Sequence, residues 1–279
     1  MTEVDIDHLR RWIGRERTAS ERITPGLVRR FEATFDRPAQ VRPGDIAPPL
    51  IHFCLAEPVA PMAGLGRDGH AALGDFLPPV PLPRRMWAGG AFRFEGALRV
   101  GEEVRRRSTV TDVTLKNGKS GPLCFVTVSH EISADGRAAV SERQDIVYRG
   151  VPGPDAVARP RPPAGPAPHT RTVAPAPTLL FRYSALTFNG HRIHYDRPFA
   201  VGTEGYPGLV VHGPMQATLL LHYAAELKGT VPQGFEFRSL GPLFDDAEFT
   251  INAEETEDGL DLWTARPGGP VAMQATARW

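Results

Sequence analysis

A proline-rich stretch in the middle of the chain limits its fold more than any other feature. Residues 151–177, VPGPDAVARPRPPAGPAPHTRTVAPAP, hold nine of the 28 prolines. Because proline lacks a backbone N–H and fixes φ, this stretch cannot continue a helix or a central strand. It is expected to be an extended, exposed linker. The chain is therefore predicted to divide into an N-terminal domain, residues 1–150, and a C-terminal domain, residues 178–279.

The N-terminal domain is predicted to combine one or two helices with an antiparallel meander. IDHLRRWIG and TPGLVRRFEATF have helical spacing, and the second segment has Thr24 as N-cap and Pro25 at its first helical position. KNGKSG predicts a hairpin turn between two of the strand-like segments that follow. Those segments are AFRFEGALRV, EVRRRSTVTDVTLK, LCFVTVSHEIS and AAVSERQDIVYR.

The C-terminal domain is predicted to be one long buried helix with an antiparallel sheet wrapped around it. The segment TLLFRYSAL is expected to be a strand. A helix should begin at Pro214 and end at Gly229, and its residues are apolar nearly all round, which indicates burial. The strand-like segments after it are FEFRSLGPLF, AEFTINAEET, GLDLWTAR and PVAMQATARW. This is an α+β pattern.

Charge and hydropathy argue against two classes of partner. Lys plus Arg and Asp plus Glu both number 32, so the balance favours neither nucleic acid nor a membrane surface. No window approaches the roughly 18 apolar residues that span a bilayer. The start, MTEVDIDHLRRWIG, lacks an apolar signal core, so a cytoplasmic location is expected. The two cysteines, Cys54 and Cys124, lie in apolar surroundings and are interpreted as small buried hydrophobes.

Four of the nine histidines fall within residues 191–222. His191 and His194 are three residues apart, and with His212 they would provide the three ligands of a catalytic zinc. The spacing fits no standard zinc pattern, however, and no acidic partners are obvious. We therefore predict no metal.

The turn VHGP, which leads into the long helix, is a second candidate feature. A helix start offers unpaired N–H groups and the positive end of the helix dipole. Because Pro214 has no N–H, Gly213 is a candidate donor, and its missing side chain lets a ligand approach. An ordinary Gly-Pro helix start is the alternative interpretation.

These motifs resemble a known family. YSALTFNGHRIHYD, followed by GLVVHGPM, resembles the hydratase signature of the MaoC-like, hot-dog-fold enoyl-thioester hydratases. LGRDGHAALGDFLPPVPLPRRMWAGG, RRRSTVTDVTLKNGKSGPLCFVTVSHEI and ERQDIVYR resemble the branch with an FAS1-like dehydratase N-terminal domain. That branch includes mesaconyl-C4-CoA and itaconyl-CoA hydratases and fungal mitochondrial hydroxyacyl-thioester dehydratases. The resemblance covers nearly the whole chain and implies a tandem (double) hot-dog fold, with a sheet around a long helix in each half.

The resemblance also implies roles for individual residues. The family pattern has an acidic residue, an asparagine two positions later and a catalytic histidine five positions later, which fall on Asn189, His191 and His194. The family's helix-start glycine, whose N–H binds the thioester oxygen, falls on Gly213. The acid is thus an asparagine here, and Asn cannot transfer a proton as a carboxyl does. Proton transfer would then fall on His194, assisted by Asp196 or His191.

We accordingly predict His194, Asn189 and Gly213 as catalytic residues. Arginine suits a substrate carboxylate or a CoA phosphate, and pairing with Asp196 or Glu204 is the structural alternative for Arg182 and Arg192. The residues predicted to contact substrate are Arg192, His191, Arg182, His212 and Asp196.

The predicted function is reversible hydration of an α,β-unsaturated acyl-CoA, with a short branched dicarboxylic acyl group such as mesaconyl or itaconyl. Coenzyme A is then the carrier of the substrate, and no cofactor is expected. A homodimer is compatible with this interpretation. Three alternatives stay open: dehydration of 3-hydroxyacyl-CoA or acyl carrier protein thioesters, a thioester-binding module without catalysis, and a thioesterase on the same fold.

Overall fold

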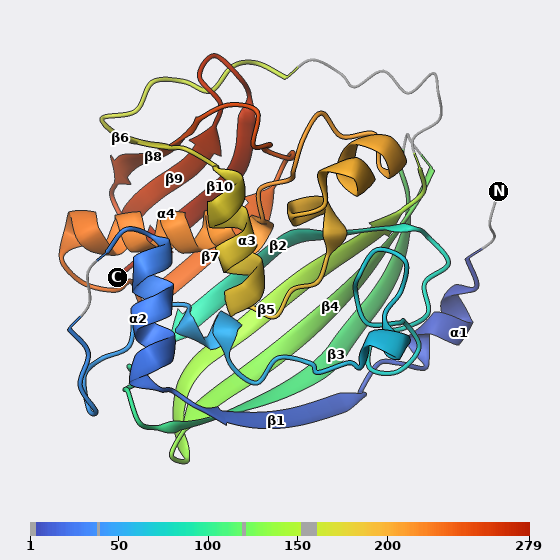
Figure 1. The fold of residues 1–279 in the computed structure, drawn as a ribbon, viewed down its shortest axis with the longest axis horizontal. Coiled ribbons are helices and arrows are strands. Elements are labelled where there is room, and N and C mark those ends of the chain that lie inside the picture. Colours follow the sequence, from blue (N-terminus) through green and yellow to red (C-terminus); the bar gives the residue numbers. More distant parts are fainter. Residues whose placement is uncertain (1–3, 38–39, 119–120, 152–160) are drawn as a thin grey trace.

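One antiparallel sheet runs through both halves of the chain (Figure 1). The computed structural model describes residues 4–37, 40–118, 121–151 and 161–279. Within them the strand order is β1-β3-β4-β5-β2-β7-β10-β9-β8-β6. The first five strands in this order precede residue 150 and the other five follow it, so the two halves lie side by side.

The N-terminal strands confirm the predicted meander. The predicted hairpin joins β3 to β4, which pair as far as Gly118 and Gly121; residues 119–120 of its turn lie outside the described residues. The predicted strand at residues 91–100 is wrong in its bounds, because β2 ends at Phe94, and β1 was not predicted because ERTASER holds no large apolar residue. The strands are β1 (Glu16–Arg22), β2 (Arg84–Phe94), β3 (Glu103–Gly118), β4 (Gly121–Ala134) and β5 (Arg137–Arg149).

The pairing of β2 with β7 (Gly234–Ser239) joins the two halves. Gly89 and Gly90 make this contact close, since a Cβ at Gly89 would lie 2.7 Å from the carbonyl oxygen of Phe237. A Cβ at Gly90 would lie 2.8 Å from the ring of Phe237, and 2.6 Å from the carbonyl oxygen of Arg143 on the other neighbouring strand, β5. The register of β2 against β5 also shifts between Trp87 and Gly89, which is a bulge.

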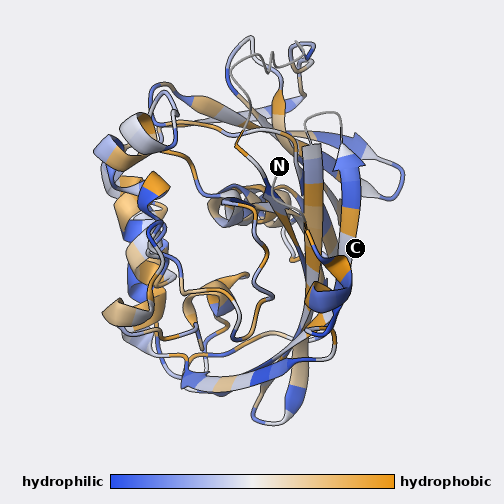
Figure 2. Ribbon diagram, turned by 90° about the vertical axis from the view of Figure 1, so that its right-hand side faces the viewer, coloured by the Kyte–Doolittle hydropathy of each residue, from blue (hydrophilic) through white to orange (hydrophobic). Residues whose placement is uncertain are grey.

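The C-terminal half has the predicted buried helix and its sheet. Helix α4 (Gly213–Lys228) lies against β7, β8, β9 and β10 and ends at Gly229, whose φ is +72°. Figure 2 shows hydrophobic and hydrophilic residues alternating along the strands, as expected for a sheet with one face in the core. The further strands are β8 (Phe249–Thr256), β9 (Gly259–Ala265) and β10 (Val271–Arg278).

The segment TLLFRYSAL is not the strand that we predicted but helix α3 (Pro177–Leu186). Pro177 starts it, and Leu180, Tyr183 and Ser184 are buried, which is helical spacing in place of alternation. The apolar run TLLF thus belongs to a segment with the helical period and not the two-residue period of a strand. The polar stretch that follows begins at the end of a helix.

Helix α2 (Pro25–Thr34) lies beside α3 and in front of the sheet (Figure 1). The Thr24 side chain accepts a hydrogen bond from the N–H of Leu27, as an N-cap does. With ten residues, α2 is shorter than α4, so the long central helix is confirmed for the C-terminal half only. The remaining helical segments are α1 (Ile6–Arg10), 3-10 turns at Ile51–Cys54, Met62–Gly64 and Arg192–His194, and a π-helical turn at Phe199–Thr203.

The proline-rich segment contributes an edge strand to the C-terminal sheet. Strand β6 (His169–Val173) pairs with β8. Residues 152–160 lie outside the described part of the chain. The division into two domains stays a prediction. Among the described helices, none has the length and apolar character needed to cross a membrane.

The two halves share one hydrophobic core. Its largest cluster includes residues of α2, β2, α4 and the C-terminal strands. His222 of α4 donates a hydrogen bond from Nε2 to the carbonyl oxygen of Pro49 over 2.8 Å. Its ring also lies edge-on to Phe31 and Phe35. The packing of α4 therefore depends on the N-terminal half.

We predict that Gly90→Ala destabilises the protein by about 1–3 kcal/mol, because its Cβ would overlap the Arg143 carbonyl and the ring of Phe237 at the β2–β7 contact. Urea unfolding measures the change. Gly234→Ala, on the partner strand, is the matched control, since its Cβ meets no atom within 4 Å. Equal stability of the two variants would contradict the packing argument.

Candidate active site

His194 lies on the 3-10 turn Arg192–His194 and is buried. Its ring stacks on that of His212, with 3.7 Å between ring centroids and 18° between planes. His212 immediately precedes Gly213, the first residue of α4. The polar loop therefore faces the start of the buried helix.

The protonation state of His194 follows from its contacts. Nδ1 lies 2.7 Å from the carbonyl oxygen of Val210, and a carbonyl only accepts hydrogen bonds, so Nδ1 carries the proton. Burial lowers the pKa of His194 to about 4, although the bond to Val210 raises it. At neutral pH the imidazole is uncharged, and Nε2 keeps a free lone pair.

His212 is held beneath His194 and is fully buried. Its Nε2 lies 2.8 Å from the hydroxyl oxygen of Ser184 on α3. Burial, followed by the charges of His194 and His191, keeps its pKa well below the ordinary value. This residue was predicted to contact substrate, but the structure places it as the support on which the ring of His194 rests.

Gly213 is partly exposed at the start of α4, beside Trp87 of β2. A Cβ there would lie 3.6 Å from the Trp87 ring, an ordinary contact distance. Its N–H donates to no described backbone or side-chain acceptor. The position thus combines a free, partly exposed donor with a place next to the His194–His212 pair, consistent with the oxyanion role that the family resemblance implies.

Asn189 shapes the loop. Its side-chain oxygen accepts a hydrogen bond of 3.0 Å from the N–H of His191, and its own N–H donates to the Ser184 carbonyl oxygen. The first contact is the Asx turn typical of Asn. His191 meets the His194 ring edge-on at 5.3 Å. Burial, followed by the charges of His70 and His194, lowers the pKa of His191.

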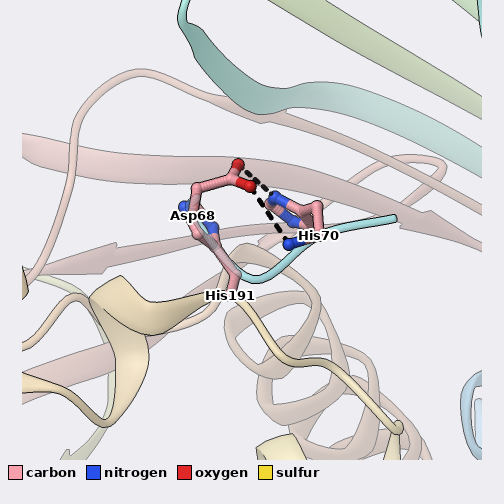
Figure 3. A group of neighbouring side chains, drawn as sticks. All are labelled: Asp68, His70 and His191. Atoms are coloured by element: carbon pink, nitrogen blue, oxygen red, sulfur yellow. Dashed lines mark hydrogen bonds and ion pairs between the residues drawn. The ribbon is translucent and has the colours of Figure 1, made fainter. Parts of the chain in front are cut away.

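Two residues that sequence reasoning did not single out belong to this cluster, Asp68 and His70 of the N-terminal half (Figure 3). The Asp68 carboxylate accepts hydrogen bonds from Nδ1 of His70 over 2.7 Å and from its backbone N–H over 3.1 Å. The His70 ring lies 4.1 Å from that of His191. The segment RDGH, within one of the motifs that resemble the family, could have indicated these two residues. It lies over 100 residues before the histidine loop, so the sequence gives no sign that the two meet.

Two glycines bring these loops together. A Cβ on Gly69, whose φ is +88°, would lie 2.0 Å from the carbonyl oxygen of Gly190. A Cβ on Gly190 would lie 2.7 Å from the carbonyl oxygen of Gly69. The N–H of Arg192 also donates to the Asp68 carbonyl oxygen over 2.9 Å. Only glycine at both positions permits this approach of the two backbones.

The two arginines predicted to contact substrate have these surroundings in the structure. The Arg192 guanidinium binds the Asp196 carboxylate over 2.7 Å and lies over the ring of Phe199, which is the structural alternative considered from the sequence. The Asp196 carboxylate also accepts from the N–H of Phe199, so both of its oxygens are used. Arg182 is exposed on α3.

Arg85 of β2 is an arginine whose charge acts on the histidines. Its charge lowers the pKa of both His70 and His191, after burial, which is the larger cause for each. It is partly buried opposite Tyr148 of β5. No ion pair involves Arg85 among the described residues, whereas its neighbour Arg84 pairs with Glu204. The site therefore holds an arginine without a carboxylate partner.

The histidine set considered for zinc is not arranged for it, because His194 and His212 are stacked ring on ring. Potential ligand atoms of a different set, Asp68, His70 and His191, lie within 4.8 Å of one another. Asp68 and His70, however, are hydrogen-bonded to each other. The cluster is therefore the imidazole of His70, held by Asp68, beside the imidazole of His191.

A continuous sheet from two similar halves, with one long central helix whose start meets a histidine loop, defines the class of double hot-dog proteins. Solved structures of this fold include a MaoC-like dehydratase from Phytophthora capsici, with a TM-score of 0.69, 13% identity and 99% of each chain covered. A Mycobacterium tuberculosis protein described as a double hot-dog fold has a TM-score of 0.58 and 15% identity, with 96% of each chain covered.

The chain belongs to the hydroxyacyl-thioester dehydratase type 2 family, whose model matches residues 50–245. It is 46% identical over 268 residues to mesaconyl-C4-CoA hydratase of Chloroflexus aurantiacus, covering 95% of each chain. It is 27% identical to the mitochondrial hydroxyacyl-thioester dehydratase type 2 of Schizosaccharomyces pombe, covering 78% of this chain and 80% of that protein. The family resemblance stated from the sequence is thereby confirmed.

The buried histidines predict acid sensitivity. Burial lowers the pKa of His194 to about 4 and that of His222 to about 3, against about 6.5 in the unfolded chain. Below pH 6.5 the unfolded chain binds protons that the folded protein does not, so stability is full above pH 6.5 and falls toward pH 4 and below. Each group contributes up to about 1.4 kcal/mol per pH unit.

Urea unfolding at pH 7.5, 6 and 4.5 measures this loss. His222→Phe keeps the aromatic packing against Phe31 and removes one titrating group, so its stability should depend less on pH. The same pH slope in both proteins would contradict the assignment.

Proposed function

We propose that this protein catalyses the reversible hydration of an α,β-unsaturated acyl-CoA thioester. The observation that carries the proposal is the position of His194, a neutral imidazole with a free Nε2, stacked beside the start of α4. Hydration needs a base for water and a donor for the thioester oxygen, and these two groups supply both. Membership of a family whose members are named as hydratase and dehydratase supports the same chemistry.

The steps follow from these groups. Nε2 of His194 takes a proton from water, and the water oxygen forms a bond to Cβ. The π electrons of the double bond move through Cα onto the thioester oxygen, where the N–H of Gly213 stabilises the charge. The imidazolium then returns its proton to Cα. One water is added, and His194 regains the state in which it started.

The reverse direction, dehydration of a 3-hydroxyacyl thioester, uses the same atoms. The relative from Schizosaccharomyces pombe carries that activity in its name, which makes it the second candidate. The higher identity to mesaconyl-C4-CoA hydratase favours a short branched acyl group with a free carboxylate as the physiological substrate.

His194→Gln is expected to reduce kcat by about 10²–10⁴-fold, because the amide cannot carry the proton from water to Cα. The loss of enoyl-thioester absorbance measures hydration of mesaconyl-C4-CoA, itaconyl-CoA and crotonyl-CoA. His8→Gln, at an exposed position on α1, is the matched control and should keep normal rates. Normal turnover by the His194 variant would remove the basis of the proposal.

We propose Arg85 as the receptor of the substrate carboxylate, in place of Arg192. Its charge acts on His70 and His191, it is partly buried, and it has no ion-pair partner among the described residues. An arginine in such a place suits a carboxylate, since its guanidinium can donate two parallel hydrogen bonds.

Arg85→Gln should lower kcat/KM for mesaconyl-C4-CoA about 10–100-fold, as expected for loss of a hydrogen bond between charged groups. Its kcat/KM for crotonyl-CoA, which has no carboxylate, should stay within a few-fold of normal. Arg93→Gln, at an exposed position on the same strand, serves as control. An equal decrease of kcat/KM for both thioesters would show that Arg85 does not bind the substrate carboxylate.

A further inference from the structure

The residue aligned with the family's usual catalytic acid is Asn189, which has no carboxyl group. Its side-chain oxygen is already engaged by the N–H of His191. The described residues nevertheless place a carboxylate next to the histidine loop, on the N-terminal half. Asp68 binds His70, and His70 lies against His191 (Figure 3).

His70 and His194 share a tautomer although they come from different halves. A carboxylate, like a carbonyl, only accepts hydrogen bonds from imidazole, so Nδ1 of His70 carries the proton. The Val210 carbonyl fixes the same tautomer in His194. Each ring thus presents an Nε2 lone pair, and His191 lies in contact with both rings.

The turn that carries Asp68 and His70 is fixed to the histidine loop. The Gly69–Gly190 backbone contact and the bond from the Arg192 N–H to the Asp68 carbonyl hold the two segments together. The guanidinium of Arg192 also donates to the Arg67 carbonyl oxygen over 3.2 Å. None of these contacts uses the side chain of Asp68 or His70, so the loops do not need those side chains in order to meet.

We propose that His70 is a second acid–base residue of this active site and that Asp68 is its positioning residue, supplying from the N-terminal half the carboxylate that position 189 lacks. The inference rests on the proposed hydration reaction. The attacking water donates one O–H to Nε2 of His70 and the other to Nε2 of His194, which directs an oxygen lone pair at Cβ. One proton leaves to an imidazole and is returned to Cα, and the other stays on the new hydroxyl group.

The carboxylate beneath His70 has the role that an acidic residue has beneath a general base. It holds the ring in one orientation, fixes its tautomer and stabilises the positive charge that forms when Nε2 takes a proton. The positive charge of Arg85 opposes protonation of this ring. Asp68 is the anionic group that offsets it.

Two variants test the pair without opening the loop contact. His70→Asn keeps an N–H able to bond to Asp68 but has no counterpart of Nε2, and it is expected to reduce kcat by about 10²–10⁴-fold. Asp68→Asn removes the charge and leaves one oxygen acceptor where the carboxylate has two; we expect kcat to fall about 10–100-fold with KM within a few-fold. Asp75→Asn is the matched control, since this exposed aspartate pairs with Arg17 away from the histidines.

The pH profile separates a chemical role from a structural one. Removing the Asp68 charge makes His70 harder to protonate, so in Asp68→Asn the acidic limb of kcat/KM should move to lower pH. In His70→Asn the imidazole is absent, so its titration should no longer contribute to the acidic limb of kcat/KM. A purely structural defect would lower the melting temperature or reduce the rate equally at every pH.

The possible outcomes are distinct. If the wild-type protein hydrates none of the enoyl-CoA substrates, the proposed function fails, and this inference fails with it. If the wild type is active while both variants keep normal kcat and an unmoved pH profile, only the inference on Asp68 and His70 is overturned. Activity that is lost on treatment with a chelator and restored by zinc would also overturn it, because the cluster would then act through a metal ion.

Discussion

The pairing of β2 with β7 is the interaction on which the rest of the structure depends. It turns two five-stranded halves into one sheet, and the close approach of Gly89 and Gly90 to Phe237 of β7 makes it possible. This pairing places the N-terminal loops against α4, where His222 binds the Pro49 carbonyl. Without it neither Trp87 nor the Asp68 turn would reach Gly213 and the histidine loop, so the geometry of the site is a consequence of strand pairing.

The candidate active site is built from uncharged imidazoles. Burial lowers the pKa values of His70, His191, His194 and His212, and the backbone carbonyl or carboxylate bound to Nδ1 selects the tautomer of two of them. A charged group in such a place would have to be desolvated, which costs much more than burying a neutral ring. The buried neutral histidines reduce the stability of the folded protein in acid, because the unfolded chain binds protons that the folded protein does not.

The sequence predicted those parts of the fold that local patterns determine. Helix α4 is marked by Pro214, an apolar run and Gly229, and β3, β4 and β5 are marked by alternation. Helix α3 was wrongly predicted as a strand, because a short apolar run fits both periods and only the packing against α2 decides. His194 and Gly213 could be aligned with a motif. Asp68 and His70 could not, because they reach His191 and the histidine loop only through tertiary structure. For Arg192 the sequence left substrate binding and pairing with an acidic residue open, and the folded loop pairs it with Asp196.

The contact between Gly69 and Gly190 has a consequence for how the two halves are connected. A turn held by a few backbone hydrogen bonds would bind weakly as a separate chain. Covalent linkage through residues 151–177 makes the association intramolecular and gives the turn a high effective concentration at the loop. The β2–β7 pairing and the shared core also hold the halves together, so glycine, which adds no side-chain contact, is sufficient where the turn meets the loop. Each half can keep only a part of the site, because the single chain always delivers the other part.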